Sequence, residues 1–161
     1  MNPERGGFRG YISSRRVRNM SFPQRIQNSI VRTYAARNGL LYKLSLTEYA
    51  MPNCFMMLDV LLAELPKLDG IILFSMFMLP SKQSVRKALY ARILENQVQL
   101  HAALEEISIR RPDETARFED TLQIAAALRS SPLRGRFRKA GQPYSPSDPF
   151  VSALRQALRS E

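Results

Sequence analysis

The sequence Gly10-Tyr11-Ile12-Ser13-Ser14-Arg15-Arg16 is followed, within a dozen residues, by Pro23-Gln24-Arg25-Ile26-Gln27-Asn28. The first stretch is typical of a short strand that runs into a polar, basic loop. The second is typical of a helix, because proline suits a first helical turn, where its missing amide hydrogen has no partner to lose. In open α/β sheets, ligands bind outside the carboxyl ends of the strands. The loop between this strand and this helix is therefore the first place to expect a functional site.

Strand and helix patterns alternate along the hundred residues that follow. The expected strands are Arg9–Ser13, Leu40–Leu46, Gly70–Pro80 and Val98–Leu104. Three helices separate them, and the third is expected to bury Val85, Leu89 and Ile93. Such alternation predicts a parallel sheet with right-handed crossovers. We predict an α/β fold, a three-layer sandwich with a four-stranded parallel sheet in the order 2-1-3-4, and a helical carboxyl-terminal extension.

Three segments are expected along the chain: a flexible leader over 1–8, the α/β domain over 9–129, and an extension over 130–161. The extension begins with a basic linker rich in Ser, Pro, Gly and Arg. Its last part has apolar residues at helical spacing, namely Phe150, Leu154 and Leu158. This amphipathic helix could dock on its own domain, on a second subunit or on a membrane surface. A homodimer through the extension is therefore one expectation.

The net charge of +10 calls for a hypothesis about the partner. Nucleic acid, anionic lipid and phosphorylated metabolites all carry the opposite charge, and a solvated basic surface is the alternative. The single cysteine, Cys54, excludes an internal disulfide framework, and no Cys/His cluster has zinc spacing, so we expect no metal and no cofactor. The amino terminus lacks a signal-peptide core, and the longest apolar run is about half of the ~20 residues that cross a bilayer. We expect a soluble, cytoplasmic protein without a transmembrane segment.

A serine-arginine loop that runs into a helix amino terminus is suited to binding phosphate. Ser13 and Ser14 would donate hydrogen bonds, and Arg15 and Arg16 would supply positive charge. The other side chains expected at the strand ends or on the adjoining helix are Tyr11, Gln24, Gln27, Asn28, Glu48, Tyr49, Ser75, His101 and Glu105.

Three of these residues are candidates for catalysis: Ser14 as a nucleophile, and Glu48 and His101 as acid or base. Each has a structural alternative. Ser14 could simply follow the end of its strand, Glu48 could orient an arginine, and His101 could be a hydrogen-bonded residue of the sheet. Cys54 is expected to be a packed small hydrophobic residue rather than a reactive thiol.

The order of elements over about residues 9 to 107 resembles the catalytic domain of resolvase-type serine recombinases. Gly10-Tyr11-Ile12-Ser13-Ser14 and the Gln-x-x-Gln helix after it are similar to the Tyr-x-Arg-x-Ser opening of that family and its helix. Ser13 stands where the opening arginine belongs, and Arg15 stands where the nucleophilic serine belongs, unless the register slips to Ser14. Ser75–Pro80 replaces the Asp-Arg-Leu-x-Arg segment after the third strand. The resemblance therefore implies the fold without the arginines that DNA strand exchange requires.

The chain is also similar, over about residues 9 to 125, to the sporadic carbohydrate cluster proteins. This small bacterial family is encoded in gene clusters for surface polysaccharides such as lipopolysaccharide O-antigen. The blocks that carry the resemblance are Gly10–Arg15, Pro23–Asn28, Leu44–Met51 and Leu100–Glu105. The resemblance implies a pathway and not a reaction. It leads us to expect an accessory protein or enzyme of surface-polysaccharide biosynthesis that binds a phosphorylated or nucleotide-linked sugar.

In this hypothesis Arg15 and Arg16 hold the phosphate, whereas Glu48, Tyr49 and His101 face the sugar. The alternative is a noncatalytic nucleic-acid-binding module with a serine-recombinase-like fold, which would use the basic tail. A third interpretation is a pure interaction protein that dimerises through its extension.

Overall fold

The computed structural model describes residues 6–130, and residues 1–5 and 131–161 lie outside the described part. The chain divides into two units after Ile124, and the sheet belongs to the first unit. The predicted basic linker and the predicted helix with Phe150, Leu154 and Leu158 lie outside the described residues. Of the predicted leader, residues 6–8 are described, and Phe8 already begins the first strand.

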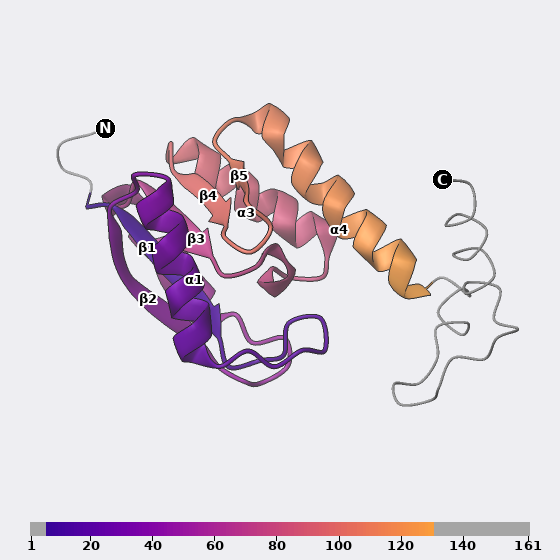
Figure 1. The fold of residues 1–161 in the computed structure, drawn as a ribbon. Helices are drawn as coiled ribbons and strands as arrows, with labels where there is room; N and C mark the ends of the chain where they lie inside the picture. The colour runs from indigo at the N-terminus through magenta and orange to yellow at the C-terminus, as the bar shows by residue number, and fades with distance from the viewer. Residues whose placement is uncertain (1–5, 131–161) are drawn as a thin grey trace, which may run out of the picture. The chain divides into compact units, whose positions relative to one another are not determined.

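Strands and helices alternate through the first unit (Figure 1). The strands are β1 (Phe8–Ser13), β2 (Tyr42–Glu48), β3 (Gly70–Leu73), β4 (Gln99–Ala102) and β5 (Ile107–Ile109). The helices are α1 (Gln24–Arg37), α2 (Met56–Glu64), α3 (Gln83–Glu95) and α4 (Thr115–Ser130). Shorter 3-10 turns cover Leu65–Lys67, Met76–Met78 and Pro112–Glu114. The alternation of strands and helices is the one that the sequence predicts.

The sheet has five strands in the order β2-β1-β3-β4-β5. Strands β1 to β4 are parallel and lie in the predicted order. The prediction of only four strands is wrong, because β5 pairs antiparallel with β4 at the edge of the sheet. Residues 103–106 alone connect the two strands. So short a connection returns the chain antiparallel, since a parallel crossover needs a dozen or more residues.

Helices cover both faces of the sheet. The His101 ring lies 5.5 Å from the ring of Phe8 in β1 and 5.7 Å from the ring of Tyr34 in α1, so these side chains share the α1 face. Arg9 follows Phe8 in the strand and therefore points to the opposite face. There its guanidinium pairs with the Glu64 carboxylate of α2 at 3.2 Å. Helix α3 lies beside α2, to which it is joined by a side-chain hydrogen bond.

The third strand is shorter than the sequence predicts. The prediction of a strand over Gly70–Pro80 is wrong beyond Leu73, where the chain leaves the sheet. Ser75 begins a 3-10 turn, and its Oγ accepts a hydrogen bond from the Phe77 amide at 3.2 Å. The Glu105 carboxylate accepts the neighbouring amide of Met76 at 3.0 Å. These two side chains replace the ladder hydrogen bonds that a longer strand would have formed.

Candidate functional site at the carboxyl edge of the sheet

A buried glutamine holds the loop that follows β1. Gln27, in the first turn of α1, accepts a hydrogen bond from the Ser13 amide (3.0 Å) and donates one to the Ser13 carbonyl (2.7 Å). Its amide nitrogen also donates to the Phe22 carbonyl at 2.8 Å. The Ser13 Oγ in turn accepts from the Arg15 amide at 2.9 Å. Gln27 and Ser13 therefore use their polar groups to shape the loop.

The two arginines of this loop differ in how firmly they are held. Arg15 Nη1 donates to the Cys54 carbonyl at 2.7 Å, and the Arg15 guanidinium lies 4.7 Å from the centre of the Phe55 ring. The Arg16 side chain is exposed, and no residue among 6–130 forms a hydrogen bond or an ion pair with its guanidinium. Arg15 is thus fixed in place, whereas Arg16 is available to a ligand.

Glu48, the last residue of β2, is fully buried beneath the loop. Its carboxylate accepts hydrogen bonds from the Tyr11 hydroxyl (2.9 Å) and from the amides of Met57 (3.0 Å) and Leu58 (3.2 Å). Burial alone would raise the pKa of Glu48, but the hydrogen bonds it accepts, that of the Tyr49 amide foremost, bring the pKa below its ordinary value. Glu48 is therefore an ionised group that accepts hydrogen bonds from the free backbone amides at the amino terminus of α2.

A cleft of about 260 Å³ opens at this edge of the sheet. This rim cleft is lined by the loops after β1, β2 and β3, which contribute, among others, Ser13, Arg15, Arg16, Phe55, Phe77 and Ser81. Arginines and hydroxyls therefore face the same space as two aromatic rings. Small-molecule sites likewise combine apolar walls with polar groups that orient the ligand.

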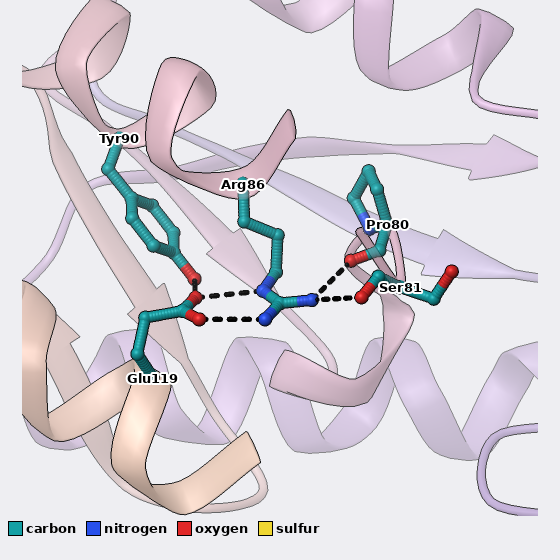
Figure 2. Close-up of polar contacts among 5 residues, drawn as sticks. All are labelled: Pro80, Ser81, Arg86, Tyr90 and Glu119. Atoms are coloured by element: carbon teal, nitrogen blue, oxygen red, sulfur yellow. Dashed lines mark hydrogen bonds and ion pairs between the residues drawn. The ribbon is translucent and has the colours of Figure 1, made fainter. Parts of the chain in front are cut away.

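A buried ion pair holds the loop after β3 in place (Figure 2). Arg86 of α3 donates from Nη1 to the carbonyls of Pro80 (2.9 Å) and Ser81 (2.6 Å). Its other two nitrogens donate to the two carboxylate oxygens of Glu119 in α4, at 2.8 and 2.7 Å. The Tyr90 hydroxyl donates to the same carboxylate at 2.9 Å. Hydrogen bonds from Arg86 lower the pKa of Glu119, and the bond to Glu119 raises the pKa of Arg86, so both groups stay charged.

The sequence patterns indicate neither this ion pair nor the aromatic walls of the cleft. Arg86 and Tyr90 lie four residues apart and so share one face of α3, which is the sequence signal that could have indicated a polar cluster. Glu119 lies 33 residues after Arg86, and no local pattern pairs them. Phe55 and Phe77 are only partly buried and carry no sequence signal that sets them apart from core aromatic residues.

Two further pairs of predicted site residues contact each other. Ser14 Oγ accepts a hydrogen bond from Gln24 Nε2 at 2.8 Å on the exposed side of the loop. Ser75 Oγ donates to the Glu105 carboxylate at 2.6 Å. The Tyr49 side chain is half exposed. Because a glutamine amide is a donor and not a base, the contact of Ser14 with Gln24 does not activate it as a nucleophile.

The structure places His101 and Asn28 away from the rim cleft. The His101 ring is buried beneath α1, with Nδ1 2.9 Å from the Tyr34 hydroxyl and Nε2 3.0 Å from Gln99 Oε1. Asn28 accepts a hydrogen bond from the Tyr42 hydroxyl of β2 at 3.4 Å. The expectation that His101 faces the ligand is therefore wrong, because the alternation of side chains along β4 turns its ring toward α1. Burial also lowers the pKa of His101 to about 4, which keeps the imidazole neutral near pH 7.

The described part of the chain holds no group of three or more His, Cys, Asp or Glu residues that could bind a metal ion. Among the same residues, no helix has both the length and the hydropathy that crossing a membrane requires.

The fold is similar to that of a serine recombinase catalytic domain, as the sequence predicts. The solved structure that shows this is the N-terminal catalytic domain of TP901-1 integrase, with a TM-score of 0.50 over 75% of this chain and 95% of that chain. The two sequences are 16% identical, so the likeness shows the fold alone. No family model and no curated protein match the chain. The resemblance to the sporadic carbohydrate cluster proteins stays a prediction from the sequence.

Proposed function

We propose that the chain binds a phosphate-bearing small molecule in the rim cleft, with Arg15 and Arg16 as the groups that hold the phosphate. The observation that carries this proposal is the pairing of a fixed arginine with an available one inside a concave site. Guanidinium groups bind phosphate oxygens through charge-assisted hydrogen bonds. A phosphorylated or nucleotide-linked sugar carries the phosphate that these two arginines would bind. The placement in surface-polysaccharide biosynthesis rests on the sequence resemblance.

The contacts of the loop support binding rather than turnover. The Cys54 carbonyl and the Phe55 ring hold Arg15 before any ligand arrives, which reduces the ordering cost of binding. Arg16 supplies a second positive charge that has no partner of its own among residues 6–130. The Glu48 carboxylate, by contrast, is already engaged by donors of the chain. We therefore propose an accessory binding role at this site.

A second candidate function is noncatalytic nucleic-acid binding. The observations that favour it are the fold shared with the TP901-1 integrase domain and the net charge of +10. Arg18, whose guanidinium lies 4.6 Å from the centre of the Phe77 ring, adds a further exposed cation to the same loop. Binding of this kind weakens steeply with added salt, because each phosphate contact releases counterions.

Thermal shift and calorimetry can distinguish the two functions. The probes are inorganic phosphate, sugar phosphates, nucleotide sugars and a DNA duplex, each tested on wild type, Arg16→Ala and Arg117→Ala. Arg117 is an exposed arginine of α4 outside the rim cleft, so both variants lose the same charge. A ligand at about 100 times its Kd should stabilise the wild type by about 2.7 kcal/mol.

We expect Arg16→Ala to bind the phosphorylated ligand about tenfold to hundredfold more weakly, since a hydrogen bond to a charged group contributes about 1.5–3 kcal/mol. Arg117→Ala should bind as the wild type does. The proposal of a small-molecule site is overturned if no small molecule stabilises the wild type and only DNA does, equally in both variants.

A further inference from the structure

A second depression, of about 420 Å³, lies between α2 and α3. Its floor is formed by the buried side chains of Leu58, Leu62 and Leu89. Val85, which the sequence predicts to be buried, is 46% exposed and stands at the wall of this interhelix groove with Ala88. The lining of the groove is mainly apolar, and the charged residues Asp59, Lys82 and Arg92 also contribute to it.

The interhelix groove is continuous with the rim cleft. Phe55 and Ser81 line both, so the apolar floor of the groove begins where the cationic wall of the cleft ends. Arg15 lies over the Phe55 ring at this junction. One molecule with an anionic head and an apolar tail would therefore find a complementary partner at each end.

We propose that the ligand is an anionic amphiphile whose phosphate binds Arg15 and Arg16 and whose aliphatic chain lies in the interhelix groove. This inference rests on the proposed function, because the phosphate site is its starting point. A sugar suits the groove less well than an aliphatic chain, since hydroxyls that lie against the leucine side chains would lose water without gaining hydrogen bonds, and only the few polar side chains, such as Asp59 and Lys82, could replace them. An aliphatic chain loses no hydrogen bond there and gains from leaving water.

The test measures affinity as a function of chain length. The probes are inorganic, ethyl, butyl and octyl phosphate, titrated below their micelle concentrations by calorimetry, with phosphorus NMR for weak complexes. A fully buried methylene contributes about 0.8 kcal/mol, or about a fourfold gain in affinity. Because the groove is open on one side, we expect a smaller gain for each methylene, with octyl phosphate binding at least about tenfold more tightly than ethyl phosphate.

Two matched variants test where the aliphatic chain of the ligand binds. Val85→Asp places a charge in the groove, whereas Val60→Asp places the same charge on α2 outside it; the two valines are 46% and 42% exposed, so both variants should fold. Val85→Asp should abolish the gain with chain length and keep the affinity for inorganic phosphate. Val60→Asp should keep both the gain with chain length and the affinity for inorganic phosphate. Arg16→Ala should weaken the binding of all four probes by the same factor.

Each other outcome overturns the inference in a distinct way. If inorganic phosphate binds and chain length adds nothing, the inference is wrong and the phosphate site stands. If no phosphate binds at all, the proposed function fails too. If chain length adds nothing and Val85→Asp instead changes the oligomeric state in light scattering, the groove is a contact between copies of the chain. If the gain persists in Val85→Asp, the aliphatic chain lies elsewhere.

Discussion

The substitution Glu119→Ala should cost the protein a large part of its stability. It leaves the Arg86 guanidinium buried, with only 8% of its side chain exposed and with its two carbonyl partners alone. Two hydrogen bonds from Arg86 and one from the Tyr90 hydroxyl disappear. Removing one member of a buried ion pair costs about 3–5 kcal/mol, because the remaining charge is uncompensated. That is a third or more of the stability of a domain at about 10 kcal/mol.

Urea denaturation followed by circular dichroism measures this loss. Asp120→Ala is the matched control, because Asp120 is the next residue of α4 and is exposed, so its removal should change the free energy of unfolding by less than about 0.5 kcal/mol. The double variant Arg86→Met, Glu119→Leu should recover part of the loss, since apolar replacement of both partners removes the buried charge but leaves the Tyr90 hydroxyl and the Pro80 carbonyl without these partners. A loss below about 1 kcal/mol in Glu119→Ala would refute the reasoning, because it would mean that water reaches the pair and that the charge is not desolvated.

Two further predictions concern the sheet. Burial lowers the pKa of His101 from 6.5 to about 4, so the unfolded chain binds more protons than the folded chain between these pH values. The free energy of unfolding should therefore fall by up to about 3 kcal/mol as pH drops through this window. In denaturant titrations from pH 6.5 downward, the free energy of unfolding should fall less steeply with pH for His101→Gln than for the wild type, and an identical slope would contradict the account. Gly70→Ala should destabilise by about 1–3 kcal/mol, because a Cβ there would overlap the Phe8 ring and lie 2.9 Å from the Gln99 carbonyl oxygen. Gly39→Asn is the control, because Gly39 has a φ of 65° and no atom lies within 4 Å of a Cβ placed there, so this variant should be nearly neutral in thermal denaturation. Equal melting temperatures of Gly70→Ala and Gly39→Asn would count against the packing argument.

Short-range patterns predicted much of the fold. The apolar run from Gly70 and the proline before α1 are each recognisable over a few residues, and each marks an element that the structure contains. The sequence predicts a site in the loop after β1, because the carboxyl ends of parallel strands in such folds lie at one edge of the sheet. The structure places Ser13, Arg15 and Arg16 at a cleft there.

Other features depended on residues far apart in the sequence. The register of β4 against β3 turned His101 toward α1, although its position in the strand was predicted well. The end of β3 depended on Glu105, which lies 29 residues after the amide of Met76 that it accepts. The antiparallel return of β5 was hidden because its three residues are too few for a periodic pattern to show.

The sequence by itself determined the order of strands and helices along the chain, the position of the basic loop and the hand of the crossovers, because periodicity, turn residues and crossover handedness are local or general constraints. Only the tertiary structure decided which side chains meet. Arg15 reaches the Cys54 carbonyl across 39 residues, and Arg86 reaches Glu119 across 33. Such contacts depend on how whole elements pack. A buried charge can be paired by an opposite charge on any element that places it in the right geometry, and the residues next to it in the sequence do not indicate which element that is.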